Sequence, residues 1–289
     1  MIPFTVQASN LRTFKEASKS ICQRVRFGSE FCMYDLPTEK TLIKAFNIAS
    51  DAGKDFTYIT PRVSDSALDT LVRHFSVLNG LGEMEVVVND LGVLDTLKKF
   101  PNLNPYLGRQ LVYIPARCPW PQITEHPASI FVRYKVKQIF YRTALNYNPT
   151  IRFYREMGVQ AADVDWIPQS FKHYKELVKH GVQLSVHSYL IPVTVTRRCH
   201  TARFLQELNP ARCSRSCLRS TFRLKQETLG AEFFLGGNVA FRYTEPQQND
   251  LKKLTDIGDI EIVIPAGDVL KAVTKHDLEK GIMKLRGEA

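Results

Sequence analysis

The stretch FTYITPRVSDSALDTLVRHFSVLNGLGEMEVVV, residues 56–88, decides the class of fold. Its two apolar ends, Phe56–Ile59 and Met84–Val88, each have the length and composition of a buried strand. Between them a helix is expected from Ser64 to Gly80. The apolar face of this helix is formed, at i, i+3, i+4 and i+7, by Leu68, Leu71, Val72 and Phe75. Strand, helix and strand in this order indicate a βαβ unit with two parallel strands.

The same alternation of apolar and amphipathic runs continues on both sides of this unit. Further strands are expected at Val25–Gly28, Leu111–Ile114, Ile139–Arg142, Asp163–Ile167, Val182–Val195 and Ile260–Ile264. With about eight β-rich runs, the chain of 289 residues favours one α/β domain, a (β/α)8 barrel of the TIM type, over a doubly wound sheet. The Pro- and Asn-rich segment 102–137 is interpreted as an irregular insertion, and Gly236-Gly237 as the turn of a hairpin.

Three of the six cysteines are crowded into residues 197–217, RRCHTARFLQELNPARCSRSC. These three are Cys199, Cys213 and Cys217. Free cysteines are commonly buried as small apolar residues, but this polar, arginine-rich setting favours metal ligands instead. The fourth ligand is expected to be Cys32, which follows the strand Val25–Gly28, whereas Cys22 precedes that strand and belongs to the opposite end of a barrel. Cys118 is interpreted as a structural or surface thiol. Four cysteines suit either zinc or a [4Fe–4S] cluster.

Charge and composition limit the possible functions. The formal net charge is +10, and segment 197–225 is a basic, cysteine-bearing loop with eight Lys or Arg residues and one acid, Glu207. Such a run is often only solvated, but it also suits nucleic acid, another anionic partner, or a group of thiolates. No apolar run approaches the roughly 18 residues of a membrane-spanning helix. The N-terminal sequence does not resemble a secretory signal, so a cytoplasmic protein without disulfides is expected.

Other polar residues are candidates for binding a substrate, because they follow expected strands or flank the cysteines. These candidates are Asn89, Asp90, Asn146, His187, Arg198, His200 and Arg203. The alternative for His187, a single histidine in a β-rich run, is a place in the core, and the alternative for His200 is simple exposure to solvent. The sequence contains no HExxH, GxSxG or P-loop motif, so it gives no indication of the hydrolase or nucleotide-binding functions that these motifs mark.

Four segments together resemble the peptidase U32 family: VRFGSEFC, VVVNDLGVL, ALNYNP, and RRCHTAR followed by a Cys-x3-Cys pair. The resemblance runs from about residue 24 to residue 220. It implies a barrel-like domain and a [4Fe–4S] cluster held by Cys32, Cys199, Cys213 and Cys217. Cys22 and Cys118 have no counterpart in the family.

Within that family the CHTAR string and Pro192 are most similar to the UbiV-type subunit of the oxygen-independent ubiquinone hydroxylation system. This resemblance implies hydroxylation of a quinone precursor or related aromatic ring, together with a U32-family partner subunit in a heterodimer. Arg198 and Arg203 would balance the charge of the cluster and bind an anionic oxygen donor. The alternatives are a hydroxylase that modifies bases in tRNA or rRNA, a peptidase or collagenase-like protease, and a zinc-stapled barrel without catalytic activity.

Overall fold

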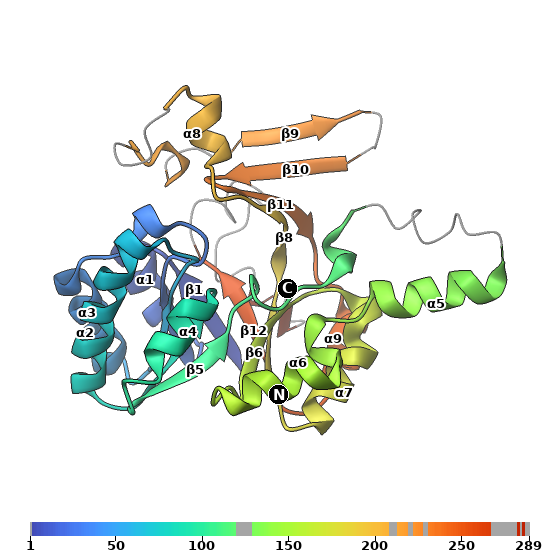
Figure 1. Ribbon diagram of the computed structural model, residues 1–289, viewed down its shortest axis with the longest axis horizontal. Coiled ribbons are helices and arrows are strands. Elements are labelled where there is room, and N and C mark those ends of the chain that lie inside the picture. Colours follow the sequence, from blue (N-terminus) through green and yellow to red (C-terminus); the bar gives the residue numbers. More distant parts are fainter. Residues whose placement is uncertain are drawn as a thin grey trace.

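The computed structural model describes residues 2–119, 129–207, 213–218, 222–227, 231–266, 282–283 and 285–286. Eight parallel strands close a barrel in the spatial order β1-β12-β7-β6-β5-β4-β3-β2 (Figure 1). They are β1 (Phe4–Ala8), β2 (Arg24–Gly28), β3 (Asp55–Ile59), β4 (Met84–Val88), β5 (Leu103–Leu107), β6 (Ala161–Asp165), β7 (Gln183–His187) and β12 (Ile260–Pro265). The expected (β/α)8 class of fold is therefore confirmed.

Helices alternate with these strands and cover the outside of the barrel. They are α1 (Leu11–Ser18), α2 (Glu39–Asp51), α3 (Asp65–Leu81), α4 (Leu91–Leu97), α6 (Asn148–Glu156), α7 (Phe171–Lys179) and α9 (Gln248–Thr255). Helix α3 matches the expected helix of the βαβ unit and buries Leu71, Phe75 and Leu78. Among the described helices, none combines the length and the apolar character that crossing a bilayer requires.

Two strand expectations were wrong, and two strands of the barrel, β1 and β5, were missed. The fifth barrel strand is β5 and not Leu111–Ile114, and Ile139 lies in α5 (Ile130–Phe140) rather than in a strand. Strand β5 reads LNPYL, and its Asn and Pro count against a strand by composition. It forms because it pairs with β4 on one side and β6 on the other. Strand β1, which the sequence did not reveal, closes the barrel between β12 and β2.

The segment 102–137, expected to be an insertion, thus begins with a barrel strand, and the irregular part starts after Leu107. Residues 120–128 of it lie outside the described residues. Helix α5 follows and extends away from the barrel (Figure 1).

A second sheet is inserted between β7 and β12. Its four antiparallel strands have the order β8-β11-β10-β9. They are β8 (Tyr189–Val195), β9 (Phe222–Gln226), β10 (Ala231–Gly236) and β11 (Val239–Thr244). The expected hairpin around Gly236-Gly237 is confirmed by the β10–β11 pair. We call residues 189–244 the β7–β12 insertion. It rises from the carboxyl end of β7, the end at which TIM barrels carry their active sites, and holds the short helix α8 (His200–Phe204) (Figure 1).

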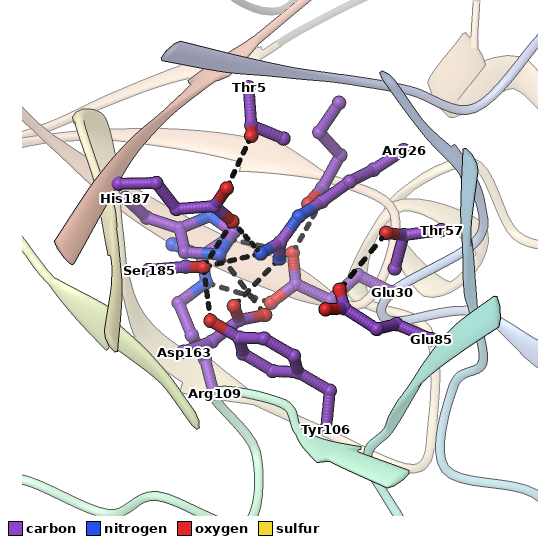
Figure 2. A network of polar contacts seen from close by, with 12 residues as sticks. Thr5, Arg26, Glu30, Thr57, Glu85, Tyr106, Arg109, Asp163, Ser185 and His187 are labelled. Atoms are coloured by element: carbon purple, nitrogen blue, oxygen red, sulfur yellow. Dashed lines mark hydrogen bonds and ion pairs between the residues drawn. The ribbon is translucent and has the colours of Figure 1, made fainter. Parts of the chain in front are cut away.

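Polar and charged side chains fill part of the barrel interior, where aliphatic residues usually dominate (Figure 2). Arg26 is fully buried and forms ion pairs with Asp163 at 2.7 Å and Glu261 at 2.6 Å. Its guanidinium carbon also lies 5.0 Å from the centre of the Tyr106 ring. A charge buried to this degree is tolerated only when it is paired and hydrogen-bonded. This polar network therefore fixes the relative positions of the strands that contribute to it.

Candidate metal centre and its cavity

A cavity of about 990 Å³ lies between the carboxyl ends of the barrel strands and the β7–β12 insertion. Strand ends and the loops after them supply one side, including Gln7, Glu30, Arg109 and His187. The insertion supplies the other side, including Arg198 and Arg203. The thiols of Cys32, Cys199, Cys213 and Cys217 all line this space. We call it the thiol cavity.

The four thiols are close enough to affect each other electrostatically. Burial raises the pKa of Cys217 to about 12, and Cys32, Cys199 and Cys213 add to the rise. Burial also raises the pKa of Cys32 to about 11, with Asp35 and Cys199 contributing. In this surrounding, neighbouring negative charge disfavours thiolates, whereas a bound cation or cationic cluster would favour them. The donor set therefore suits a metal or an iron–sulfur group.

Backbone N–H groups point toward two of the sulfurs. The N–H of Ala202 lies 3.4 Å from the sulfur of Cys199, which is the N-cap of α8. The N–H of Arg215 lies 3.4 Å from the sulfur of Cys213. For Cys32, N–H groups of the next turn act in the same direction and lower its pKa against the effect of burial. Such donors stabilise negative charge on sulfur and tune the reduction potential of iron–sulfur clusters.

The insertion is attached to the loop that carries Cys32. The amide of Asn238, in the β10–β11 turn, donates to the carbonyl oxygens of Phe31 and Thr196, both at 2.9 Å. Gly237, with φ +65°, precedes it, and a Cβ there would lie 3.5 Å from the sulfur of Cys217. The turn thus connects the barrel loop with both ends of the cysteine-bearing segment.

A second link joins the same two regions. Arg215 lies 4.0 Å from the carboxylate of Asp35. Burial raises the pKa of Asp35 to about 6, and Arg215 opposes that rise. Both residues line the thiol cavity, next to Cys213 and Cys32 in the chain.

Within the described residues, no three His, Cys, Asp or Glu side chains are grouped tightly enough to hold one metal ion. The thiols surround a common space and do not converge on a single point. Residues 208–212 and 219–221, which flank Cys213 and Cys217, lie outside the described residues.

On the barrel side, the thiol cavity is closed by buried ion pairs (Figure 2). Arg109 donates to both carboxylate oxygens of Glu30 at 2.8 Å and to Asp165 at 3.1 Å. Nε2 of His187 lies 3.1 Å from one carboxylate oxygen of Asp163. The other oxygen of Asp163 forms the ion pair with Arg26. Burial alone would raise the pKa of Asp163, but Arg26 and His187 outweigh it and hold the pKa at about 2. The carboxylate stays ionised beside the ring of His187.

Apolar side chains form another part of the wall. The rings of Phe31 and Phe241 meet edge to face, with centroids 5.5 Å apart. Arg109 lies 5.5 Å above the ring of Phe31. Leu190 and Val195 line the same space. An aromatic ring can pack against this wall while polar substituents face the arginines.

The residues expected to bind substrate divide into two groups. His187, Arg198 and Arg203 line the thiol cavity. Asn89, Asp90, Asn146 and His200 are not among the residues that line it.

The first three residues of the second group have structural partners, and Asn146 follows helix α5 rather than the expected strand. Asn89 is fully buried, donates to the carbonyl of Thr60 at 2.9 Å and accepts from the N–H of Gln110 at 3.0 Å. Asp90 caps α4 through the N–H of Gly92 at 2.8 Å. Asn146 is bonded within its own capping turn.

The ion pairs on the barrel side were missed by sequence reasoning. Glu30 and Arg109 are 79 residues apart, and no local pattern indicates that they pair. One weak indication existed, since Glu30 stands two residues before Cys32 in a loop that follows a strand.

Fold and site together define a class of protein, a (β/α)8 barrel with a cysteine-bearing insertion above the carboxyl ends of its strands. Neither a protein-family model nor a curated protein matches the chain. Among solved structures, dihydropteroate synthase from Thermus thermophilus is similar, with a TM-score of 0.44, 11% identity, and 99% of this chain and 92% of that chain covered. Orotidine 5'-monophosphate decarboxylase from Sulfolobus solfataricus is similar with a TM-score of 0.42 and 10% identity, and the match covers 99% of this chain and 97% of that chain. The U32 peptidase Mk0906 is similar with a TM-score of 0.43 and 12% identity, and the match covers 93% of this chain and 94% of that chain.

Proposed function

We propose that this protein holds a [4Fe–4S] cluster through Cys32, Cys199, Cys213 and Cys217. The observation that carries the proposal is that these four thiols, from two regions of the chain far apart in sequence, line one cavity at the catalytic end of the barrel. The N–H groups directed at the sulfurs of Cys199 and Cys213 support it, because thiolates bonded to iron–sulfur clusters accept such hydrogen bonds.

A cluster and a zinc ion differ in the separation of sulfurs that they require. A tetrahedral zinc site with Zn–S bonds of about 2.3 Å needs sulfurs roughly 4 Å apart. A [4Fe–4S] cluster bonds each thiolate to a different iron, so its ligands surround a larger volume. The described thiols lie around a common space without forming a single-ion group.

We further propose that the thiol cavity hydroxylates an aromatic ring, such as a quinone precursor, without molecular oxygen. The ring would pack against Phe31 and Phe241. An anionic donor would bind Arg198 and Arg203 and give up one oxygen atom, so that a ring C–H becomes C–OH while the donor is reduced by two electrons. The bound cluster would supply one-electron chemistry. His187, which lines the cavity beside Asp163, would take up or return a proton there. The proposal includes a related partner subunit.

A second candidate function is base modification in RNA. It is favoured by exposed cations of the insertion, such as Arg223 and Lys225 on β9. This function requires RNA binding that weakens steeply with salt, because each phosphate contact releases counterions. A flat salt dependence in a binding titration would remove it.

The test of the cluster is anaerobic purification or reconstitution, followed by assays of iron, acid-labile sulfide and zinc. We expect about four irons and as many sulfides per chain. Cys32→Ala should empty the site as completely as Cys213→Ala. Cys22→Ala and Cys118→Ala are the matched controls and should leave it filled. Stoichiometric zinc, or full iron content in Cys32→Ala, would contradict the proposal.

The reaction is tested separately. The reconstituted chain is incubated anaerobically with an aromatic quinone precursor and candidate oxyanion donors, with and without a partner subunit. Hydroxylated product is then measured by mass spectrometry. His187→Gln should lower the rate and leave the iron content unchanged, since its ring lies on the barrel side of the cavity. Loss of iron in that variant would instead indicate a structural role.

A further inference from the structure

Helix α5 (Ile130–Phe140) leaves large apolar side chains in solvent. None of its residues is buried, although its sequence IFVRYKVKQIF is mostly apolar. Ile130 is 79% exposed, Phe131 69%, Tyr134 61% and Ile139 56%. A helix that is apolar on most sides is normally buried or lies at a membrane. The exposed residues of α5 therefore require a covering surface.

The helix is anchored at one end and projects at the other. Gln138, near its C-terminal end, accepts from Lys172 of α7 at 2.8 Å. Phe140 packs against the hydrophobic core. The N-terminal end, with Ile130 and Phe131, points away from the body of the molecule (Figure 1). The most exposed apolar side chains thus stand at the projecting tip.

The charges of α5 itself have one sign. Residues 130–140 contain no Asp or Glu, and their cations are Arg133, Lys135 and Lys137. Lys135 lies with its ammonium 5.5 Å from the centre of the Phe131 ring, so apolar and cationic groups are interleaved. Long basic side chains can bury their stems in lipid while the charge reaches the phosphates.

We propose that α5 docks on the surface of an anionic phospholipid bilayer, with Ile130 and Phe131 inserted among the acyl chains and the basic residues on the headgroups. Apolar tip residues and neighbouring cations are the two contributions by which interfacial helices bind membranes. The cations of α5, with no acid in the helix, complement anionic lipid and would repel a basic protein surface. The proposal does not depend on the cluster or on the reaction assigned to the thiol cavity.

The test is co-sedimentation of the full chain with vesicles of phosphatidylcholine, alone or with roughly one-third phosphatidylglycerol. The wild-type chain should pellet with the anionic vesicles and remain largely in solution with the neutral ones. The double variant Ile130→Ser/Phe131→Ser should bind at least tenfold more weakly, and Arg133→Gln/Lys135→Gln roughly fivefold more weakly for each charge removed.

Matched controls are Ile21→Ser, an exposed apolar residue before β2, and Lys44→Gln, an exposed cation on α2. Both should bind like the wild type. Equal binding of the wild type to neutral and anionic vesicles, or unchanged binding of the tip variant, would overturn the proposal. A change of oligomeric state in the tip variant without vesicle binding by the wild type would also overturn it, and would assign the helix to a protein contact.

Discussion

Replacing Arg26 with methionine is expected to destabilise the barrel by roughly 3–5 kcal/mol, the usual effect of removing one partner from a buried ion pair. The side chain is fully buried, and it is paired with Asp163 at 2.7 Å and Glu261 at 2.6 Å. The variant Arg26→Met fills most of the volume but leaves these two carboxylates without their cation. For Asp163 alone, lowering of the pKa from 3.8 to about 2 corresponds to roughly 2 kcal/mol in favour of the charged form.

The assay is urea unfolding at two pH values, with the exposed pair Arg73–Glu39 as a control. In the wild type, stability from Asp163 is present above pH 3.8 and lost as the pH falls toward 2, because the folded pKa is the lower one. In Arg26→Met the carboxylates gain by protonation, so the loss of stability should be smaller at pH 4.5 than at pH 7. Arg73→Met should change stability by less than about 1 kcal/mol, since that pair is half exposed. A loss below about 1 kcal/mol for Arg26→Met, or one independent of pH, would refute the reasoning.

Three further expectations concern a close approach, a buried histidine and the insertion. In urea unfolding, Gly28→Ala should lower the free energy of unfolding by roughly 2–4 kcal/mol, because φ of Gly28 is +138° and a Cβ would lie 2.2 Å from a carbonyl oxygen of β3. The control Gly80→Ala, where a Cβ meets open space on helix α3, should be neutral or slightly stabilising. Burial lowers the pKa of His74 to about 4, so as the pH falls the unfolded chain takes up this proton before the folded chain does. The free energy of unfolding should therefore fall by roughly 3 kcal/mol between pH 6.5 and 4, and His74→Gln should flatten that decline. Asn238→Ala should lower iron retention in a chelator challenge, because the amide of Asn238 links the β10–β11 turn to the loop that carries Cys32. Asn104→Ala breaks an exposed hydrogen bond and should retain iron like the wild type; equal retention in both variants would count against the link.

The sequence predicted the fold where local and long-range preferences agree. The unit at residues 56–88 formed as expected because its apolar periodicity suits both its own elements and the closed barrel. Leu111–Ile114 is apolar, and Val112 and Ile114 are buried, but they fill the core from a loop. The strand between β4 and β6 is instead LNPYL, which is extended because it pairs with both neighbours.

The site shows the same division. Loops after parallel strands meet at one end of a barrel, so the sequence was enough to predict that Cys32 lies near the other three cysteines. All four do line one cavity. Their binding of a metal stays a prediction. Contacts between distant charges, such as Arg109 with Glu30 and Asp165, depend on the final register of the barrel, and no periodicity encodes them.

The β7–β12 insertion leaves the barrel and returns to it at neighbouring points, since Tyr189 of β8 pairs with Thr244 of β11. A short loop from Ser188 to Glu245 could replace it with little loop-closure entropy. The insertion is therefore a graftable module. A (β/α)8 barrel can acquire or lose three thiols in a single insertion or deletion, and a resident cysteine in an existing loop is all that the recipient barrel must add.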